Sequence, residues 1–364
     1  MIRVAQVMGY MDGGGVEQVV MNYYRHVDRA TAQFDLLVCE GSGMVPRDEV
    51  EGLGGRVLMV PGYGNLPRFM RALERLFRQE RWPIVHSHVN ALSVFPLCAA
   101  KRAGVLVRIA HSHSTSGRGE PVRNAMKAAL RPLSNVYPTY RMACSRYAGE
   151  WLFGGGVNFE VLYNAIDLAR FAFDAGVRVR VRAELGLMEG QLAVLHVGRF
   201  TEQKNHRFLI EAFAKASRRR PDAILLLAGE GDSRPSIERR VSELGLADRV
   251  KFLGQRSDVE RLYSAADTFV LPSLYEGLPV VSVEAQASGL PCLLSDQITR
   301  EVDVTGNVRF LPIVDSDLWA DVLCTVRSSG RVGVCNGDFA DYDIVRAGKR
   351  LTERYEELFE RVRV

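Results

Sequence analysis

Two glutamates in the second half of the chain are spaced so that both can serve one ligand. Glu276 lies in the segment PSLYEGLP, residues 272–279, and Glu284 follows eight positions later. A proline in the first turn and a Gly-x-Pro sequence after the last turn are typical of a short helix, so the pattern predicts a helix over 279–287. Glu276 then lies in the loop before this helix, and Glu284 lies one to two turns inside it.

The residue types of this segment suit hydroxyl groups and phosphate. Carboxylates accept hydrogen bonds from the vicinal hydroxyls that sugars and riboses supply. The N–H groups of Gly277 and Leu278 lie at the expected helix N-terminus, where they can bind a phosphate oxygen. The ordinary explanation for Glu284 is an acid favoured by the helix dipole. A carboxylate next to Val283 and Ala285, however, needs a partner if it is buried.

A basic loop follows an expected strand in the same half of the chain. The segment VGRFTEQKN, residues 197–205, carries Arg199 and Lys204 between a strand and a helix. Arginine offers a planar fork of donors and lysine a mobile point charge, and both suit phosphate. At a helix N-terminus they can neutralise a diphosphate without a metal ion. The alternative is a basic loop in solvent, but the strand–loop–helix setting favours a phosphate site.

Two further loops at strand ends are rich in glycine. DGGGVE, residues 12–17, follows the first expected strand, and Gly14 and Gly15 there let the backbone approach a ligand closely. The spacing differs from that of the dinucleotide-binding fingerprint GxGxxG. AGEGD, residues 228–232, places Glu230 in a permissive loop. Taken alone, each loop is as consistent with a tight turn as with a ligand site.

Short β-rich runs alternate with helical patterns, and these elements must position the four loops. The alternation predicts an α/β fold of two tandem Rossmann-like doubly wound domains facing a cleft, with ligands beyond the carboxyl ends of the strands. The expected strands are Ile2–Met8, Phe34–Cys39, Arg56–Val60, Ile84–Ser87, Val107–His111, Met142–Cys144, Ala193–Val197, Ala223–Leu227, Val250–Leu253, Thr268–Leu271 and Cys292–Leu294. The expected helices include Pro67–Gln79, Ala91–Ala103, His206–Ser217, Pro235–Leu244, Val259–Ala265, Pro279–Ala287 and Asp341–Val362.

The same pattern suggests how the chain is divided. We expect an acceptor-side domain over residues 1–165, a linker at 166–190 with mixed periodicity, and a donor domain at 191–340. A charged, amphipathic helix at 341–364 is expected to cross back to the first domain.

Together the motifs resemble one known family. The spacing of Glu276 and Glu284 is similar to the EX7E pattern of retaining glycosyltransferases with the GT-B fold. With VGRFTEQKN, AGEGD and GGGVE each in its expected domain, the chain resembles glycosyltransferase family 4 along nearly its whole length. LYNAID, residues 162–167, is similar to the family's NG(V/I)D signature, with Ala165 where glycine is usual. HSHSTSG, residues 111–117, resembles the subgroup that builds bacterial exopolysaccharide or capsule.

The resemblance implies a role for each candidate residue in the donor domain. Arg199 and Lys204 hold the donor diphosphate. Glu276 contacts hydroxyls of the transferred sugar, Glu284 contacts the donor ribose, and Glu230 lines the donor pocket.

In the first half, the resemblance implies that Gly14 and Gly15 approach the diphosphate or the acceptor, and that His111 lies beside the transferred sugar. The implied enzyme is a retaining hexosyltransferase. Its donor is a nucleotide-sugar, with UDP favoured as the nucleotide, and its acceptor is a glycan or a lipid-linked glycan in polysaccharide biosynthesis.

The chemistry of transfer indicates that no metal cofactor is required. Negative charge builds on the nucleoside diphosphate as its bond to the sugar breaks, and Arg199, Lys204 and helix N-terminal amides can stabilise that charge. Retention without an obvious nucleophile suggests a front-face reaction in which a phosphate oxygen takes the acceptor's proton. The DSD string at Asp315–Asp317 is better explained as a helix N-cap.

Four histidines offer a rival metal site. Each His-x-His pair puts alternate residues on one face of a strand. Without an acidic or cysteine partner, the two pairs are weak evidence for a cluster of His86, His88, His111 and His113.

Three other functions remain as alternatives. A glycosidase needs two carboxylates that flank a glycosidic bond but has no use for the Arg199/Lys204 loop. A GT-B sugar-nucleotide epimerase would interconvert donors without an acceptor. A non-catalytic partner protein would bind the nucleotide-sugar without turnover.

Composition limits the partners further. A chain of 364 residues with net charge +4 fits two globular domains, and its six cysteines contain no CxxC pair, as in reduced cytoplasmic proteins. No apolar run reaches the ~18–20 residues of a membrane span, and the N-terminus lacks the features of a signal peptide. Basic residues over 118–146 suit an anionic surface at the inner face of the plasma membrane, or else a solvated helix face. No nucleic-acid-binding motif is present.

Overall fold

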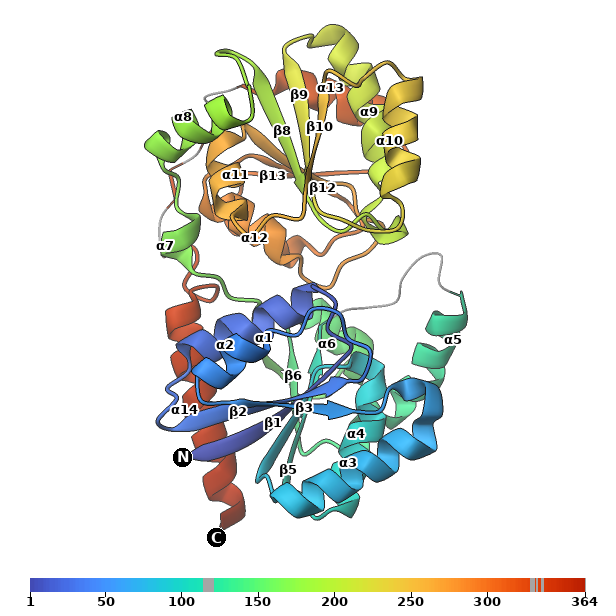
Figure 1. Cartoon of the computed structure of the whole chain (residues 1–364), viewed down its shortest axis with the longest axis vertical. Coiled ribbons are helices and arrows are strands. Elements are labelled where there is room, and N and C mark those ends of the chain that lie inside the picture. Colours follow the sequence, from blue (N-terminus) through green and yellow to red (C-terminus); the bar gives the residue numbers. More distant parts are fainter. Residues whose placement is uncertain (114–120, 328–330, 332, 335–336, 364) are drawn as a thin grey trace. The chain divides into compact units, whose positions relative to one another are not determined.

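The computed structural model describes residues 1–113, 121–327, 331, 333–334 and 337–363, without the side chains of residues 121–123. The chain forms two compact units (Figure 1). The first contains Met1–Ser116, Glu120–Ile166 and Asp341–Val364, and the second contains Gly117–Gly119 and Asp167–Ala340. Among the helices of the described residues, none is both long and apolar enough to cross a membrane.

The first unit is built on a seven-stranded parallel sheet. Its strand order is β3-β2-β1-β4-β5-β6-β7, which reverses direction between β1 and β4. The strands are nearly continuous apolar runs, as expected of a sheet covered on both faces. They are β1 Ile2–Gly9, β2 Ala32–Cys39, β3 Arg56–Val60, β4 Ile84–Ser87, β5 Val107–Ser112, β6 Tyr140–Ala143 and β7 Glu160–Val161.

Helices cover both faces of this sheet. They are α1 Gly15–His26, α2 Arg47–Gly52, α3 Leu66–Glu80, α4 Val94–Arg102, α5 Pro121–Leu130, α6 Arg146–Phe153 and α14 Ile344–Arg363, with 3-10 turns η1 Tyr63–Asn65, η2 Asn90–Ser93 and η3 Arg131–Asn135.

The C-terminal helix α14 packs against α1 in the first unit (Figure 1). Its start is fixed because Ile166 N donates to Tyr342 O at 2.9 Å and Ile344 N donates to Ile166 O at 3.0 Å. Gly348 allows the close approach of the two helices, since a Cβ there would lie 2.6 Å from His26 O. Chain segments far apart in sequence are therefore locked side by side.

The second unit repeats the architecture with six parallel strands in the order β10-β9-β8-β11-β12-β13, which reverses between β8 and β11. The strands are β8 Leu192–Val197, β9 Ala223–Ala228, β10 Val250–Gly254, β11 Thr268–Leu271, β12 Cys292–Ser295 and β13 Val308–Leu311. The helices are α7 Leu168–Phe171, α8 Ala175–Glu184, α9 His206–Arg219, α10 Arg234–Glu243, α11 Val259–Ala265, α12 Val280–Ala287 and α13 Ser316–Thr325, with 3-10 turns η4 Glu202–Lys204 and η5 Arg300–Val302.

The predicted α/β fold class is confirmed, because both sheets are parallel and have the doubly wound order. The segment expected to be a linker, 166–190, carries α7 and α8. The helix predicted over 279–287 begins one residue later, since Pro279 is its N-cap in extended conformation. In doubly wound sheets, ligands bind beyond the strand ends where the order reverses. The relevant loops are those after β1 and β4, and those after β8 and β11.

Candidate active site

An ion pair in the second unit joins the two loops at the point where its strand order reverses. The Lys204 Nζ lies 2.6 Å from the Glu276 Oε1, and both side chains are largely buried. Lys204 follows β8 and Glu276 follows β11. Gln203 Nε2 also donates to Glu276 Oε2 at 3.2 Å and to the Tyr275 carbonyl at 3.0 Å. The carboxylate predicted to bind sugar hydroxyls is thus held by the loop predicted to bind phosphate.

Backbone contacts fix the geometry of these two loops. Asn205 adopts a left-handed conformation, with φ of 55°, and its side chain donates to the Pro272 carbonyl at 3.2 Å. Asparagine is one of the few residues that tolerate this conformation. Leu274 N donates to Gln203 O at 2.8 Å. The turn that begins α9 is therefore anchored to the loop after β11.

The loop after β9 packs directly against the loop after β8. A Cβ at Gly229 would lie 2.1 Å from Gly198 O, and one at Gly231 would lie 2.5 Å from Phe200 O. Only glycine fits at either position, because both also have positive φ. Glu230 lies between them with a half-exposed side chain that forms an ion pair with Arg234.

Three other candidates surround this centre. Arg199 is exposed, and within the described residues no ion pair or hydrogen bond engages its side chain. Gly277 and Leu278 immediately precede α12, and Leu278 is buried.

Glu284, on α12, has a contact that its spacing did not predict. The Tyr263 hydroxyl of α11 donates to Glu284 Oε2 at 2.8 Å. Burial raises the pKa of Glu284 to about 7, against the opposing effects of the Tyr263 hydrogen bond and the Arg170 charge. Near neutral pH this carboxyl group is only partly ionised, and it becomes a better hydroxyl acceptor as it loses its proton.

In the first unit, the glycine loop is wrapped around an acidic side chain. Gly14 is the N-cap of α1, and Gly15 is its first residue. The Glu17 carboxylate accepts from Asp12 N at 2.9 Å and from Gly13 N at 2.7 Å. Burial raises the pKa of Glu17 despite these hydrogen bonds. Two amides that an incoming anion could have used are therefore already bonded to a carboxylate.

The four histidines at the ends of β4 and β5 form one buried cluster. His111 Nδ1 lies 3.1 Å from His86 Nε2, and His88 Nδ1 lies 2.9 Å from His113 Nε2. Burial lowers the pKa of His86 and His113 to about 3, and burial and the neighbouring rings hold the pKa of His111 and His88 well below the usual range. His111 is therefore a neutral imidazole, suited to orienting a ligand by hydrogen bonding. Residues 114–117 of HSHSTSG lie outside the described residues.

The cluster also bears on the two possible metal sites. One nitrogen each of His86, His88 and His111 lies within 4.8 Å of the others. Hydrogen bonds within the cluster already use most of these nitrogens, so a metal ion would have to break them. The N-cap prediction for the DSD string is confirmed, because the Asp315 carboxylate accepts from Leu318 N at 2.9 Å.

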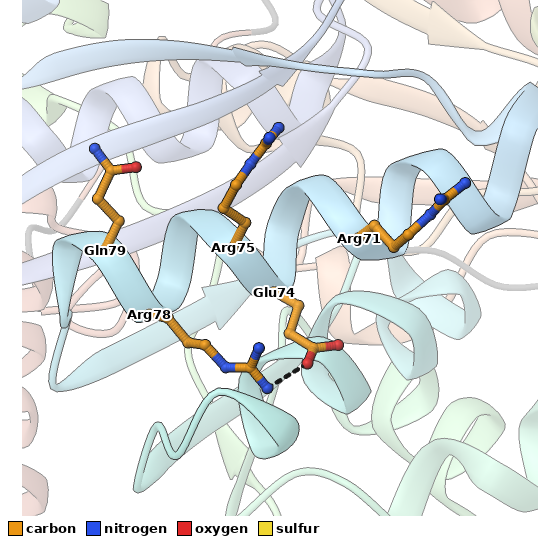
Figure 2. Close-up of a pocket in the computed structure, with 5 residues that line it drawn as sticks. All are labelled: Arg71, Glu74, Arg75, Arg78 and Gln79. Atoms are coloured by element: carbon orange, nitrogen blue, oxygen red, sulfur yellow. Dashed lines mark hydrogen bonds and ion pairs between the residues drawn. The ribbon is translucent and has the colours of Figure 1, made fainter.

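A hollow on the first unit is not a candidate active site. Figure 2 shows that its lining residues all project from α3: Arg71, Glu74, Arg75, Arg78 and Gln79. Glu74 pairs with Arg78 at 2.5 Å. One helix supplies the whole lining, and none of the strand-end loops contributes, so this is a basic helix surface.

Sequence reasoning missed three residues that contact the candidate site. Gln203 was inside the basic loop but attracted no attention beside two cations. Glu17 was quoted with the glycines, and its fourth-residue spacing from Gly13 is a signal of carboxylate capping. Tyr263 left no local signal, since it reaches Glu284 from another helix.

Comparison with known proteins identifies the family. Residues 13–170 match "Glycosyltransferase Family 4", and residues 178–308 match "Glycosyl transferases group 1". EpsF of Bacillus subtilis (strain 168), whose name describes a glycosyltransferase, is 38% identical over 341 residues, or 90% of this chain and 88% of EpsF. The Escherichia coli UDP-Gal:alpha-D-GlcNAc-diphosphoundecaprenol alpha-1,3-galactosyltransferase is 27% identical, over 81% of this chain and 79% of that protein.

A solved structure supports the fold. Anabaena HepE, crystallised in complex with UDP and glucose, has a TM-score of 0.79 to this chain at 18% identity, covering 98% of this chain and 100% of HepE. This likeness confirms the GT-B arrangement of two doubly wound sheets. With both halves matched to glycosyltransferase families and a relative of 38% identity along nine-tenths of its length, the chain belongs to glycosyltransferase family 4 and is a retaining glycosyltransferase.

Proposed function

We propose that the enzyme transfers a hexose from a UDP-sugar to a lipid-linked glycan during synthesis of a bacterial exopolysaccharide, capsule or similar surface glycan. The buried Lys204–Glu276 pair at the strand-order reversal, beside the exposed Arg199, carries this proposal. The printed names of two relatives supply the substrate classes. The Escherichia coli relative acts on UDP-Gal and a diphosphoundecaprenol-linked sugar, and HepE was crystallised with UDP and glucose. The likeness to EpsF and the HSHSTSG segment support polysaccharide synthesis.

In the proposed reaction, the donor takes over the ion pair. Without donor, Glu276 and Lys204 neutralise each other. The donor diphosphate binds Lys204 and Arg199, which frees the Glu276 carboxylate to accept from sugar hydroxyls, while Glu284 accepts from the ribose. As the bond from the anomeric carbon to the diphosphate breaks, both cations stabilise the charge on the leaving group.

Retention follows from attack on the face that the leaving group occupies. The acceptor hydroxyl forms the new bond to the anomeric carbon, and its proton passes to an oxygen of the departing diphosphate. His111 contributes a neutral hydrogen-bonding group that orients the sugar. Gly14, Gly15 and Glu230 contribute to donor binding, and Gly277 and Leu278 offer their amides to the phosphate.

The direct test is transfer with defined substrates. The enzyme is incubated with UDP-glucose or UDP-galactose and an undecaprenyl-diphosphate-linked N-acetylhexosamine, and the product's anomeric configuration is determined by NMR. We expect a disaccharide lipid with the donor's α configuration. Free hexose as the sole product would indicate a hydrolase, and interconversion of the donors without acceptor would indicate an epimerase.

Metal independence is part of the proposal, because two cations already serve the leaving group. Transfer is measured after exhaustive chelation with EDTA and dialysis. We expect activity to stay within about twofold of the untreated enzyme. An inactive chelated enzyme that recovers with Mg²⁺ or Mn²⁺ would overturn this prediction.

We also propose that the first unit contacts an anionic membrane at the inner face of the plasma membrane, where a lipid-linked acceptor is available. Within residues 118–146, α5 and η3 expose Met126, Leu133 and Val136 next to Lys127 and Arg146. Apolar side chains flanked by basic ones suit insertion at the surface of an anionic bilayer. Two arginines of this segment have structural contacts instead, since Arg131 stacks on Trp151 and Arg141 binds Asn135.

A further inference from the structure

One face of the first sheet carries a continuous chain of buried polar side chains. Strand register explains why they share that face. Gln6 pairs with His86, and His86 pairs with Ile109. Side chains two residues further on point the same way, which brings His88 and His111 onto this face. The histidine chain, as we name it, consists of His113, His88, Gln6, Tyr355, His86 and His111.

The two arms of the histidine chain meet at Gln6. In one arm, His88 Nε2 lies 2.8 Å from Gln6 Oε1, and His88 Nδ1 lies 2.9 Å from His113 Nε2. In the other, Gln6 Nε2 donates to the Tyr355 hydroxyl at 3.1 Å. That hydroxyl lies 2.7 Å from His86 Nδ1, and His86 Nε2 lies 3.1 Å from His111 Nδ1. Tyr355 comes from α14, 349 residues away from Gln6.

The amide of Gln6 sets the direction of every proton in the histidine chain. Because its Nε2 donates to Tyr355, the tyrosine proton goes to His86 Nδ1. His86 then carries its own proton on Nε2 and donates it to His111 Nδ1, which leaves the proton of His111 on Nε2.

The other arm continues the same direction. Gln6 Oε1 accepts from His88 Nε2, so His88 Nδ1 accepts from His113 Nε2, and His113 Nδ1 keeps a lone pair. This deduction requires neutral rings, and burial lowers the pKa of all four histidines.

The two ends of the histidine chain are consequently a donor and an acceptor. If the Gln6 amide were turned over, every proton would shift together and the two ends would exchange roles, but they would still be complementary. The end rings, His111 and His113, stack with centroids 4.0 Å apart. Within the described residues, His111 Nε2 and His113 Nδ1 are buried and have no hydrogen-bond partner. Buried polar atoms of this kind call for a partner that the protein itself does not supply.

We propose that His111 and His113 together bind one hydroxyl group of the transferred sugar, which accepts from one ring and donates to the other. Gln6 and Tyr355 are positioning residues, because they fix the protons of both rings without touching the sugar. A hydroxyl is the group that fits, since it can donate and accept at one oxygen. The inference rests on the proposed function, in which His111 faces the transferred sugar.

The first test needs no ligand. Histidine side-chain ¹⁵N NMR on the wild-type enzyme reports which ring nitrogen carries the proton. We expect all four histidines of the chain to be neutral at pH 7 and to have the same tautomer, Nε2–H for the Gln6 orientation described here. A mixture of Nε2–H and Nδ1–H tautomers among the four rings would overturn the proposal.

Tyr355→Phe separates the two arms. We expect the fixed tautomers of His86 and His111 to be lost while those of His88 and His113 persist, because Gln6 still holds the second arm. The matched control is Tyr24→Phe, which removes an equally buried hydroxyl that donates to Gln33 at 2.7 Å outside the histidine chain. Unchanged His86 and His111 tautomers in Tyr355→Phe would contradict the proposed direction.

Transfer kinetics connect the histidine chain to function. We expect Tyr355→Phe to lower kcat roughly tenfold, the loss typical of one net hydrogen bond, with Tyr24→Phe near wild type. One monodeoxy analogue of the accepted UDP-hexose should react slowly with the wild type, and His113→Ala should remove most of that discrimination. Discrimination that persists in His113→Ala would overturn the subsite. Failure of UDP to stabilise even the wild type would instead refute the proposed function, because UDP is assigned to residues of the second unit.

Discussion

At the scale of single residues, burial decides how each carboxylate of the candidate site can act. Glu276 is buried but paired with Lys204, so it is held ready for exchange with a donor. Glu284 has no such cation among its hydrogen-bond partners in the described residues and relies on the Tyr263 hydroxyl. The same EX7E spacing therefore presents one paired carboxylate and one whose protonation changes near neutral pH.

Glu284 should make the stability of the free enzyme depend on pH. Its folded pKa of about 7 lies above the usual 4.5, so the folded state binds a proton that the unfolded state releases. This contribution to the free energy of unfolding is fully present below pH 4.5 and is lost as the pH rises through about 7. Urea denaturation of Glu284→Gln between pH 5 and 8 should show a smaller decline than the wild type.

Glu238→Gln, on the half-exposed surface of α10, is the control and should retain the wild-type pH dependence. Parallel curves for the wild type and Glu284→Gln would show that the Glu284 pKa is not raised by folding.

At the scale of elements, glycines let the loops after β8 and β9 touch. Gly229→Ala places a Cβ 2.1 Å from Gly198 O at a φ of 145°. Strain and overlap at such a site predict a loss of roughly 2–4 kcal/mol in the free energy of unfolding. The measurement is the urea midpoint, and donor binding should weaken because the Arg199 loop must move.

Gly245→Ala tests whether the effect comes from the contact or only from the backbone. Gly245 also has positive φ, 68°, but no atom lies within 4 Å of the added Cβ. Its loss should be about 1 kcal/mol. Equal losses for the two variants would refute the close-packing explanation.

The elements also show what the sequence can predict. Continuous apolar runs identified Arg56–Val60 and Thr268–Leu271 with the observed bounds. The edge strands β7 and β13 were not predicted, because one has two residues and the other includes the exposed Arg309.

Within the candidate site, motif spacing pointed to Lys204 and Glu276 but not to their contact, which depends on the order of β8 and β11 in the sheet. The link from Gln6 to Tyr355 had no sequence signal at all. It joins the first strand to the last helix, and only the three-dimensional packing of α14 brings them together.

At the scale of the whole molecule, net charge and a basic, partly apolar surface predict membrane association. Binding to vesicles of neutral lipid is compared with binding to vesicles containing anionic lipid. We expect preference for anionic vesicles, and at least tenfold weaker binding by Lys127→Glu/Arg146→Glu, since each basic residue near such a surface contributes about 1 kcal/mol.

The matched control reverses charges on the helix face of Figure 2. Arg71→Glu/Arg75→Glu changes the net charge equally but lies on α3, so it should bind nearly as well as the wild type. Equal binding to both kinds of vesicle, or binding to neither, would count against a membrane partner.

The central claim is that the second unit binds a nucleoside diphosphate through Lys204. The thermal stabilisation by UDP, GDP, ADP and CDP is measured for the wild type, Lys204→Ala and the control Lys215→Ala, which removes a lysine paired with Asp317 on the surface. A ligand at 100 times its Kd adds about 2.7 kcal/mol, or several degrees in Tm. We predict that UDP stabilises the wild type and Lys215→Ala and that Lys204→Ala, compared with its own ligand-free Tm, loses most of this shift. An undiminished shift in Lys204→Ala, or no shift by any nucleotide in the wild type, would contradict the assignment of this site.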